Sequence, residues 1–216
     1  MPYSNDLGPS IYSKRKLSGQ KSEQKLTTVS NSNLIAPSYW AIKTSEGGGK
    51  NSKEHWSMFE REKVVAIGWE RVAIDPSRVN AAELLVAVHA AYPDNKPGAD
   101  NFAVRTIRDF VELPIDSLMM ICRGYTPNQS DGKSVQVYAF ARVTGQLMAV
   151  PYVAGQWRFR RPAMLQGIYK TLSVGVMRDL LKLGSLRQTM HQLSREQIKA
   201  IAAELGNLCT SSASSA

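Results

Sequence analysis

The chain has 216 residues, of which 43% are apolar, and its 27 Lys and Arg against 18 Asp and Glu give a formal charge of +9. This length suits one domain with tails. No run of about 18 apolar residues occurs, and no apolar segment follows the basic N-terminus, so we expect neither a membrane-spanning helix nor a secretory signal. Two cysteines, Cys122 and Cys209, are too few for a disulfide framework, which predicts a reduced, soluble, cytoplasmic protein.

The chain begins with a polar segment. Residues 1–36 are rich in Ser, Lys, Gln and Asn and show no hydrophobic period, which predicts a flexible basic arm. A folded domain is predicted from 37 to 207, followed by a disordered tail at 208–216. The domain opens with strands at Tyr39–Lys43 and 64–69, the second apolar enough to be covered on both faces.

Two helices are predicted after the second strand, at Ala81–Ala91 and 101–111, because apolar residues recur there at helical spacing. Pro93 forbids continuation of the first. Further strands follow at Leu118–Cys122, 135–143 and 157–160, and turn-rich residues join the first two of these as a hairpin.

The predicted domain ends with helices. One spans 174–183, and the last begins at a capping box formed by Ser194 and Gln197 and ends at Gly206. Strands and helices do not alternate as β-α-β units. The order therefore predicts an α+β domain of about five to six strands with inserted and flanking helices.

The charge is uneven along the chain. Residues 1–36 carry +3, residues 37–156 are neutral, and residues 157–216 carry +6. A local excess of this kind favours polyanions, although a solvated basic helix face would show the same excess. Arg158, Arg160 and Arg161 stand beside Trp157 and Phe159, which favours phosphate binding. We therefore expect these three arginines to contact phosphates.

Catalytic and metal-binding patterns are weak. The loop at 47–50 resembles a P-loop in its Gly-Lys pair, but a P-loop needs glycine at Thr44 and Ser or Thr at Asn51. Glu60 and Glu62 are residue types used by metal-dependent nucleases, without an aspartate at a matching spacing. The histidines and cysteines show no metal-ligand spacing. We expect no catalytic residue, no metal, no cofactor and no enzyme activity.

Tryptophan is the more informative residue type. The four tryptophans, Trp40, Trp56, Trp69 and Trp157, are predicted at strand ends or loop edges and outside the helical stripes. Each could be a core residue. Aromatic rings in such places also grip bases, and stacking contributes roughly 1–3 kcal/mol per base. An extruded base can be held between rings while hydrogen bonds read its edge.

Several segments together resemble a known family. They are Tyr39–Lys43, the glycine loop with Trp56 and Phe59 after it, the ending Ala66-Ile67-Gly68-Trp69, residues 138–145 and residues 157–161. This set is similar to PUA-like domains of the EVE kind, and most of all to the N-terminal sensor domain of Mrr-like, modification-dependent restriction nucleases. The likeness covers about residues 38–205. Residues 115–117, Ile-Asp-Ser, depart from the Gly-Asp pair of the family, and no nuclease domain follows.

The resemblance implies a PUA-like pseudo-barrel that binds a modified or flipped base beside its first strand. It places Trp40, Lys43, Thr44, Trp56 and Trp69 at or near the base. Lys50 and Lys53 would join the three arginines in holding phosphates. The expected function is a reader of a base in DNA, part of a restriction or defence system in which a separate nuclease or effector subunit acts. Two alternatives stay open: a protein-interaction module that uses the barrel as a scaffold, and an RNA-binding PUA-like protein.

Overall fold

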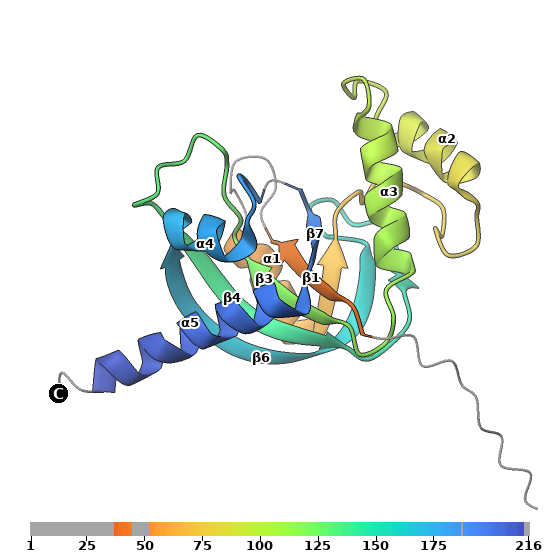
Figure 1. The fold of residues 1–216 in the computed structure, drawn as a ribbon. Helices are drawn as coiled ribbons and strands as arrows, with labels where there is room; N and C mark the ends of the chain where they lie inside the picture. Colours follow the sequence, from red (N-terminus) through yellow and green to blue (C-terminus); the bar gives the residue numbers. More distant parts are fainter. Residues whose placement is uncertain (1–36, 45–51, 187, 214–216) are drawn as a thin grey trace, which may run out of the picture. The chain divides into compact units, whose positions relative to one another are not determined.

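Figure 1 shows the protein as a computed structural model that describes residues 37–44, 52–186 and 188–213. Side chains are described in these ranges except at Ser52 and 207–213. The predicted arm at 1–36, the glycine loop with Lys50, and residues 214–216 of the predicted tail lie outside the described residues.

Seven strands and five helices make up the described part of the chain. The strands are β1 (Tyr39–Lys43), β2 (Val64–Ile67), β3 (Leu118–Cys122), β4 (Ser134–Val143), β5 (Met148–Ala149), β6 (Phe159–Ser173) and β7 (Met190–Leu193). The helices are α1 (Ser52–Glu62), α2 (Ala81–Ala91), α3 (Ala99–Val111), α4 (Val174–Leu181) and α5 (Arg195–Ala213). Among the described residues, no helix has the length and apolar character needed to cross a membrane.

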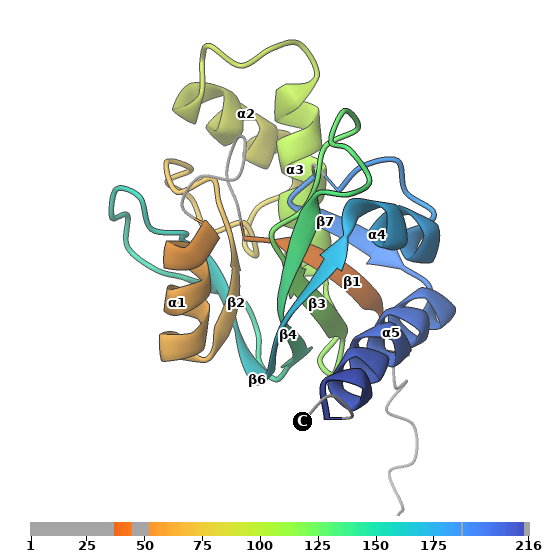
Figure 2. The same ribbon diagram turned by 90° about the vertical axis from the view of Figure 1, so that its left-hand side faces the viewer.

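The strands form one curled sheet in the order β2-β6-β4-β3-β1-β7, with β5 paired to β6. β1 runs parallel to β3, and the other pairs are antiparallel. The sheet curls into a half-barrel, with β6 as its long lower strand in Figures 1 and 2. The α+β class is therefore confirmed, including the β3–β4 hairpin and the two helices inserted after β2.

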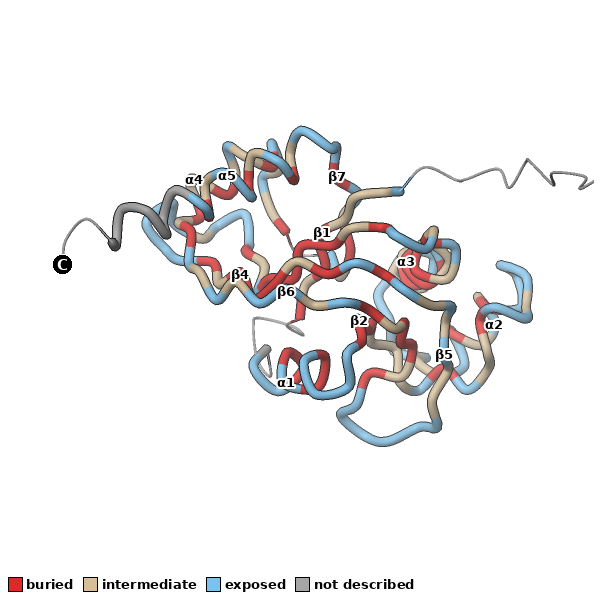
Figure 3. The backbone as a smooth tube through the Cα atoms, turned by 90° about the horizontal axis from the view of Figure 1, so that it is seen from below, coloured by how far each residue is buried: buried red, intermediate tan, exposed pale blue. Residues whose placement is uncertain are grey.

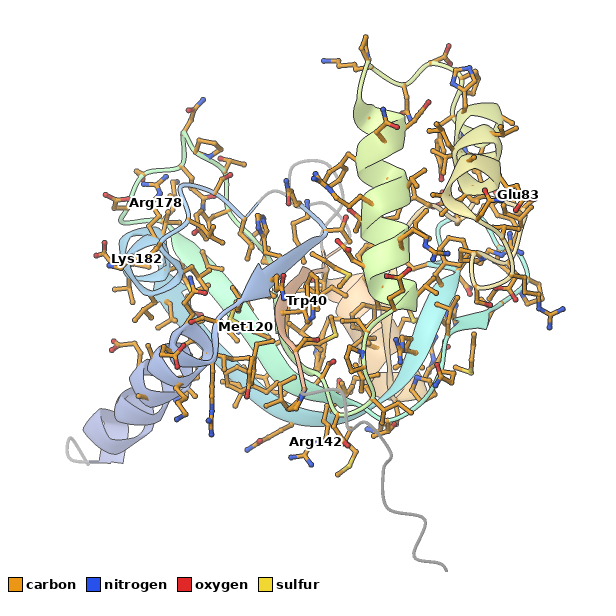
Figure 4. All side chains as sticks on the ribbon, turned by 45° about the vertical axis from the view of Figure 1, so that its right-hand side comes forward. Trp40, Glu83, Met120, Arg142, Arg178 and Lys182 are labelled. Atoms are coloured by element: carbon orange, nitrogen blue, oxygen red, sulfur yellow. The ribbon has the colours of Figure 1, made fainter. Side chains whose placement is uncertain are left out.

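The two faces of the sheet have different covers. On one, here called the α1 face, residues of α1, α2 and α3 join the strands in a core that contains Phe59, Ile107 and Phe110. On the other, the α5 face, α4 and α5 pack over Met120 and Val137. Figure 3 shows these buried segments along the tube, with exposed positions between them. In Figure 4, Met120 lies toward α5 and Trp40 toward α3.

Helix ends follow local side-chain chemistry. Asn80 accepts from the backbone of Glu83, whose carboxylate accepts from the backbone of Asn80, and this capping box begins α2. Ser194 and Gln197 exchange the same pair of bonds before α5, as predicted. The predicted end at Gly206 is wrong, because α5 continues to Ala213. A glycine costs a helix about 1 kcal/mol and does not by itself end one.

Two further predictions are corrected. β6 runs from Phe159 to Ser173, far beyond the predicted 157–160. Pro162 and Gly167 are residue types that normally end a strand, so a prediction from sequence stops before them. In the structure, Pro162 pairs with the short strand β2 and Gly167 lies at a bulge, so β6 continues through both. Trp56, predicted at a loop edge, lies inside α1.

Candidate functional site

The regular pairing of the sheet breaks at Tyr138. On one side of β4, Val137 and Ala139 face Cys122 and Ile121 of β3, so Tyr138 is an extra residue. On the other side, Val137 pairs with Lys170 and Ala139 with Gly167, so Ile168 and Tyr169 together oppose Tyr138. Such bulges redirect side chains and are frequent beside functional sites.

Tyr169 is the most unusual residue of this bulge. Its φ of 52° lies in the left-handed region, which is rare for a large aromatic residue. Its ring lies over Gly167, where a Cβ atom would come 2.8 Å from Tyr169 Cε2. Gly167 therefore leaves the space that the ring occupies.

Trp56 of α1 joins the two tyrosines into an aromatic cluster. Its ring stacks on Tyr138 with centroids 5.4 Å apart and planes 13° apart, and it meets Tyr169 edge-on at 5.8 Å and 76°. Trp56 is 5% exposed and Tyr138 7%, whereas Tyr169 is 53% exposed. The aromatic cluster, defined as Trp56, Tyr138 and Tyr169, thus extends from the core to the surface.

A carboxylate fixes the outer end of the aromatic cluster. The Tyr169 hydroxyl donates to Glu60, one turn beyond Trp56 on α1. This hydrogen bond raises the pKa of Tyr169 above its ordinary value of 10.0, and a hydrogen bond with Trp56 acts in the opposite direction. The phenol is therefore protonated at neutral pH, and its ring is held by contacts from α1 and β6.

A row of polar residues crosses the sheet beside the aromatic cluster. It comprises Thr44 and Arg123, which directly follow β1 and β3, and Gln136 and Thr171, which lie in β4 and β6. The Arg123 backbone donates to the Gln136 carbonyl at 2.9 Å, and Gln136 pairs with Thr171. Thr171 Oγ1 donates to Gln136 Oε1 at 3.2 Å, and Thr44 Oγ1 to the Cys122 carbonyl at 3.4 Å. Because side chains alternate along a strand, this polar row lies on the α1 face.

Four of the five predicted base-binding residues face the same side of the sheet. Trp40, Trp56 and Trp69 pack in or against the core of the α1 face, and Thr44 is in the polar row. The Trp40 indole donates to Ser38 Oγ at 2.8 Å. Trp69, after the end of β2, has a φ of 61° and is half-buried. Of these residues, only Trp56 belongs to the aromatic cluster.

The fifth residue, Lys43, lies on the opposite face. Its stem packs against Gly124, where a Cβ atom would come 2.7 Å from Lys43 Cδ. It is also near Cys122 on the α5 face. Burial raises the pKa of that thiol to about 12, and the Lys43 charge partly opposes the rise. Residues 43 and 44 point to opposite faces, so the structure does not bring Lys43 together with the other four residues predicted to bind the base.

Arg161 is enclosed in the protein. It is 0% exposed. Its guanidinium donates to the carbonyls at the end of α3 and after it, and to one carbonyl before β5: Phe110 at 3.1 Å, Val111 at 3.2 Å, Leu113 at 2.6 Å and Gly145 at 3.0 Å. The last carbonyls of a helix have no partner within it, and a cation satisfies them well.

The other two arginines are also bonded internally. Arg160 is buried, donates to the Trp157 carbonyl at 2.8 Å and forms an ion pair with Glu62. Arg158 donates to the carbonyls of Val150, at 2.8 Å, and Ala73, at 3.1 Å. Arg160 and Arg161 are buried and Arg158 is half-buried, and the guanidinium groups of all three bond to the elements around them. That these arginines contact phosphates stays a prediction.

Lys53 is the remaining described residue of the predicted phosphate set. It is exposed on α1, three residues before Trp56, and residues at that spacing share a helix face. Lys53, Trp56 and Glu60 therefore follow one side of α1.

No three His, Cys, Asp or Glu side chains gather closely enough to hold a metal ion in the part of the chain that the structure describes. Tyr138, Tyr169, Gln136, Thr171 and Arg123 were absent from the predicted site. Gly167 within a strand-like stretch is the available signal, since glycine in a strand often marks a bulge. A comparison with models of known families and a search of characterised proteins find no match.

Proposed function

We propose that this protein is a nucleic-acid reader that stacks one base on the exposed ring of Tyr169. The observation that carries the proposal is the aromatic cluster at the bulge, which presents a half-exposed ring held in place by buried ones. A base stacked on an aromatic ring gains roughly 1–3 kcal/mol. A ring that is already ordered loses little entropy when it binds.

The geometry favours stacking on the cluster over insertion into it. A base between two rings needs them about 7 Å apart, twice the usual contact distance. Trp56 and Tyr138 have centroids 5.4 Å apart and are buried, so they support Tyr169. This arrangement replaces the cage between tryptophans that the family resemblance implies.

The polar row supplies the groups that would accompany a stacked base. Gln136 Nε2 donates to the carbonyls of Val137, at 3.1 Å, and Lys170, at 3.0 Å, and the Thr171 hydroxyl donates to Gln136 Oε1. The groups left for a base edge are therefore the oxygens of Gln136 and Thr171, which act as acceptors, and Arg123 is exposed at the same level of the sheet. Lys53 and Arg123 are the phosphate contacts of the proposal. Among the described residues, twenty Lys and Arg against fifteen Asp and Glu leave a charge of +5.

The finer parts of the proposal come from the family resemblance. They are a PUA-like pseudo-barrel, a modified base in DNA, a cytoplasmic restriction or defence system and a separate effector subunit. The curled half-barrel sheet is compatible with the first.

A second candidate is a protein-interaction module. It is favoured by the tip of the β5–β6 hairpin, where Tyr152 and Val153 are exposed while Arg158 fixes the base of the hairpin through Val150. In that reading, the aromatic cluster is structural and the hairpin tip is the contact surface.

A binding experiment distinguishes the two candidate functions. Binding of the protein to labelled single-stranded DNA, duplex DNA and RNA is measured by fluorescence anisotropy. Tyr169→Ala should weaken binding about 5-fold to 150-fold, the loss of one base stack. Tyr152→Ala is the matched control, since both tyrosines are 53% exposed. Loss of binding only in Tyr152→Ala, or no binding to any of the nucleic acids, would contradict the proposal.

A further inference from the structure

Two carboxylates of α1, only two residues apart, have different partners. Glu62 pairs with Arg61, at 2.9 Å, and with Arg160. Glu60 is exposed, and among the described residues its bonding partner is the Tyr169 hydroxyl, with no cation beside it. Glu62 is thus neutralised as part of the fold, whereas Glu60 forms no ion pair with a described residue and lies next to the ring proposed to stack a base.

This carboxylate is an acceptor with capacity left. An ionised carboxylate has two oxygens with about four lone-pair sites, and the Tyr169 hydroxyl occupies one of them. Because the pKa of Tyr169 is raised, the phenol remains the donor in this bond across the neutral pH range. The outer edge of the aromatic cluster therefore offers acceptors and negative charge to a ligand.

Such an edge selects between bases. Exocyclic amino groups, as on cytosine, adenine and guanine, donate to a carboxylate. Thymine and uracil have carbonyl oxygens on both sides of their single ring donor, and those oxygens face the negative charge of Glu60 unfavourably. A phosphate is repelled for the same reason, which keeps the backbone on the side of Lys53 and Arg123.

We propose that Tyr169 and Glu60 together make the site specific for bases that carry an exocyclic amino group, with Tyr169 stacking on the ring and Glu60 accepting from the amino group. This inference rests on the proposed function and specifies its ligand class. In the same arrangement Gly167 is a positioning residue, because its missing side chain sets where the Tyr169 ring can lie.

The test uses two single-stranded oligonucleotides that differ only in a central deoxycytidine or deoxyuridine, two pyrimidines of equal size. The full chain should bind the deoxycytidine oligonucleotide at least about fivefold more tightly, the lower limit for one good base contact. Glu60→Gln should bring the two affinities to within about twofold, because an amide both donates and accepts. Glu54→Gln, on the same helix and also exposed, should leave the preference unchanged.

A second variant changes the position of the Tyr169 ring and leaves Tyr169 and Glu60 themselves in place. In Gly167→Ala the new methyl group must displace the Tyr169 ring from its position, so the preference should fall at least about threefold. Because that ring is half-exposed, the melting temperature should stay close to that of the parent. Gly184→Ala is the control, since a Cβ atom there meets nothing within 4 Å.

The outcomes separate this inference from the function on which it depends. Equal affinity for the two oligonucleotides, with binding that still weakens in Tyr169→Ala, overturns the assignment of Glu60 and leaves the reader in place. A preference that survives in Glu60→Gln overturns it as well. Failure to bind either oligonucleotide overturns both proposals.

Discussion

The two halves of β6 differ in nearly every respect. Its first five residues, 159–163, are almost entirely buried, and two of them are arginines bonded inside the protein. From residue 164 onward the strand alternates between exposed and half-buried residues, with Leu172 buried, and it contains the bulge and Tyr169. One half supports the fold with charged side chains, and the other carries an aromatic ring to the surface.

This difference shows that charge along a sequence does not locate a binding surface. Arg160 and Arg161 contribute to the charge excess of the last quarter of the chain, yet both are used within the fold. Tyr169, an uncharged residue, presents the exposed ring on which we propose that a base stacks. Substitutions in the two halves of β6 should therefore have separable effects, on stability in the first half and on binding in the second.

The largest expected effect is the loss of stability when Arg161 is replaced. Arg161→Ala leaves four carbonyl groups without their donor and should lower the free energy of unfolding by at least about 3 kcal/mol. Urea denaturation measures this change. Arg142→Ala is the control, because Arg142 is exposed and projects from the lower edge of the sheet in Figure 4. Its change should stay within about 0.5 kcal/mol; similar losses in the two variants would contradict the structural role of Arg161.

Arg160→Ala should lower the free energy of unfolding by about 1.5–3 kcal/mol, because it breaks the ion pair with Glu62. This is the usual contribution of a hydrogen bond to a charged group. Measured below its melting temperature, this variant should keep the parent's dependence of nucleic-acid affinity on salt. A shallower salt dependence would mean that the first half of β6 contacts phosphate after all, and the distinction between the halves would fail.

Lys53→Ala should weaken binding through electrostatics alone. The slope of log affinity against log salt should become shallower by about 0.9 on duplex DNA, or about 0.7 on a single strand, which corresponds to one phosphate contact. Lys96→Ala, a change at an exposed lysine between α2 and α3, should leave the slope unchanged. Equal slopes for Lys53→Ala and the parent would remove Lys53 from the phosphate contacts.

The smallest effect concerns the pKa of Tyr169. The hydrogen bond to Glu60 raises this pKa above 10.0, so the phenol should ionise later than an ordinary tyrosine as pH rises. Removing the carboxylate in Glu60→Gln should shift the ionisation to lower pH. Ultraviolet difference titration of each protein against its Tyr169→Phe counterpart isolates the signal. An unchanged titration in Glu60→Gln would mean that the bond does not persist in solution.

Much of the fold follows from local sequence patterns. α2 was predicted at its observed bounds because an apolar period and a following proline mark it, and β3 because a short apolar run is bounded by turns. β7 and most of β6 were missed. Apolar and polar side chains alternate poorly along residues 164–171, because few of these residues are buried. This part of the strand is held by its pairing with β4, and a local sequence pattern does not reveal that pairing.

The candidate site was predicted only in part. Trp56 was named because tryptophan is conspicuous, although its helical position was not foreseen. Tyr138 and Tyr169 both reach Trp56 because of two register shifts across three strands, and register depends on tertiary pairing. The internal bonding of the arginine triplet could not be predicted, because the sequence shows its charge but not the carbonyl groups of α3 and of the β5–β6 hairpin that surround it.

The central claim is that ligand binding belongs to the second half of β6 and to the aromatic cluster. Nuclear magnetic resonance of the isotopically labelled protein, titrated with a short single-stranded oligonucleotide, tests it most directly. The account predicts chemical-shift changes at the backbone amides of residues 164–173 and at the Trp56 indole, with the Trp157 indole and the Arg160 and Arg161 amides unchanged. Changes confined to the first half of β6, with Tyr169 and Trp56 unaffected, would contradict it.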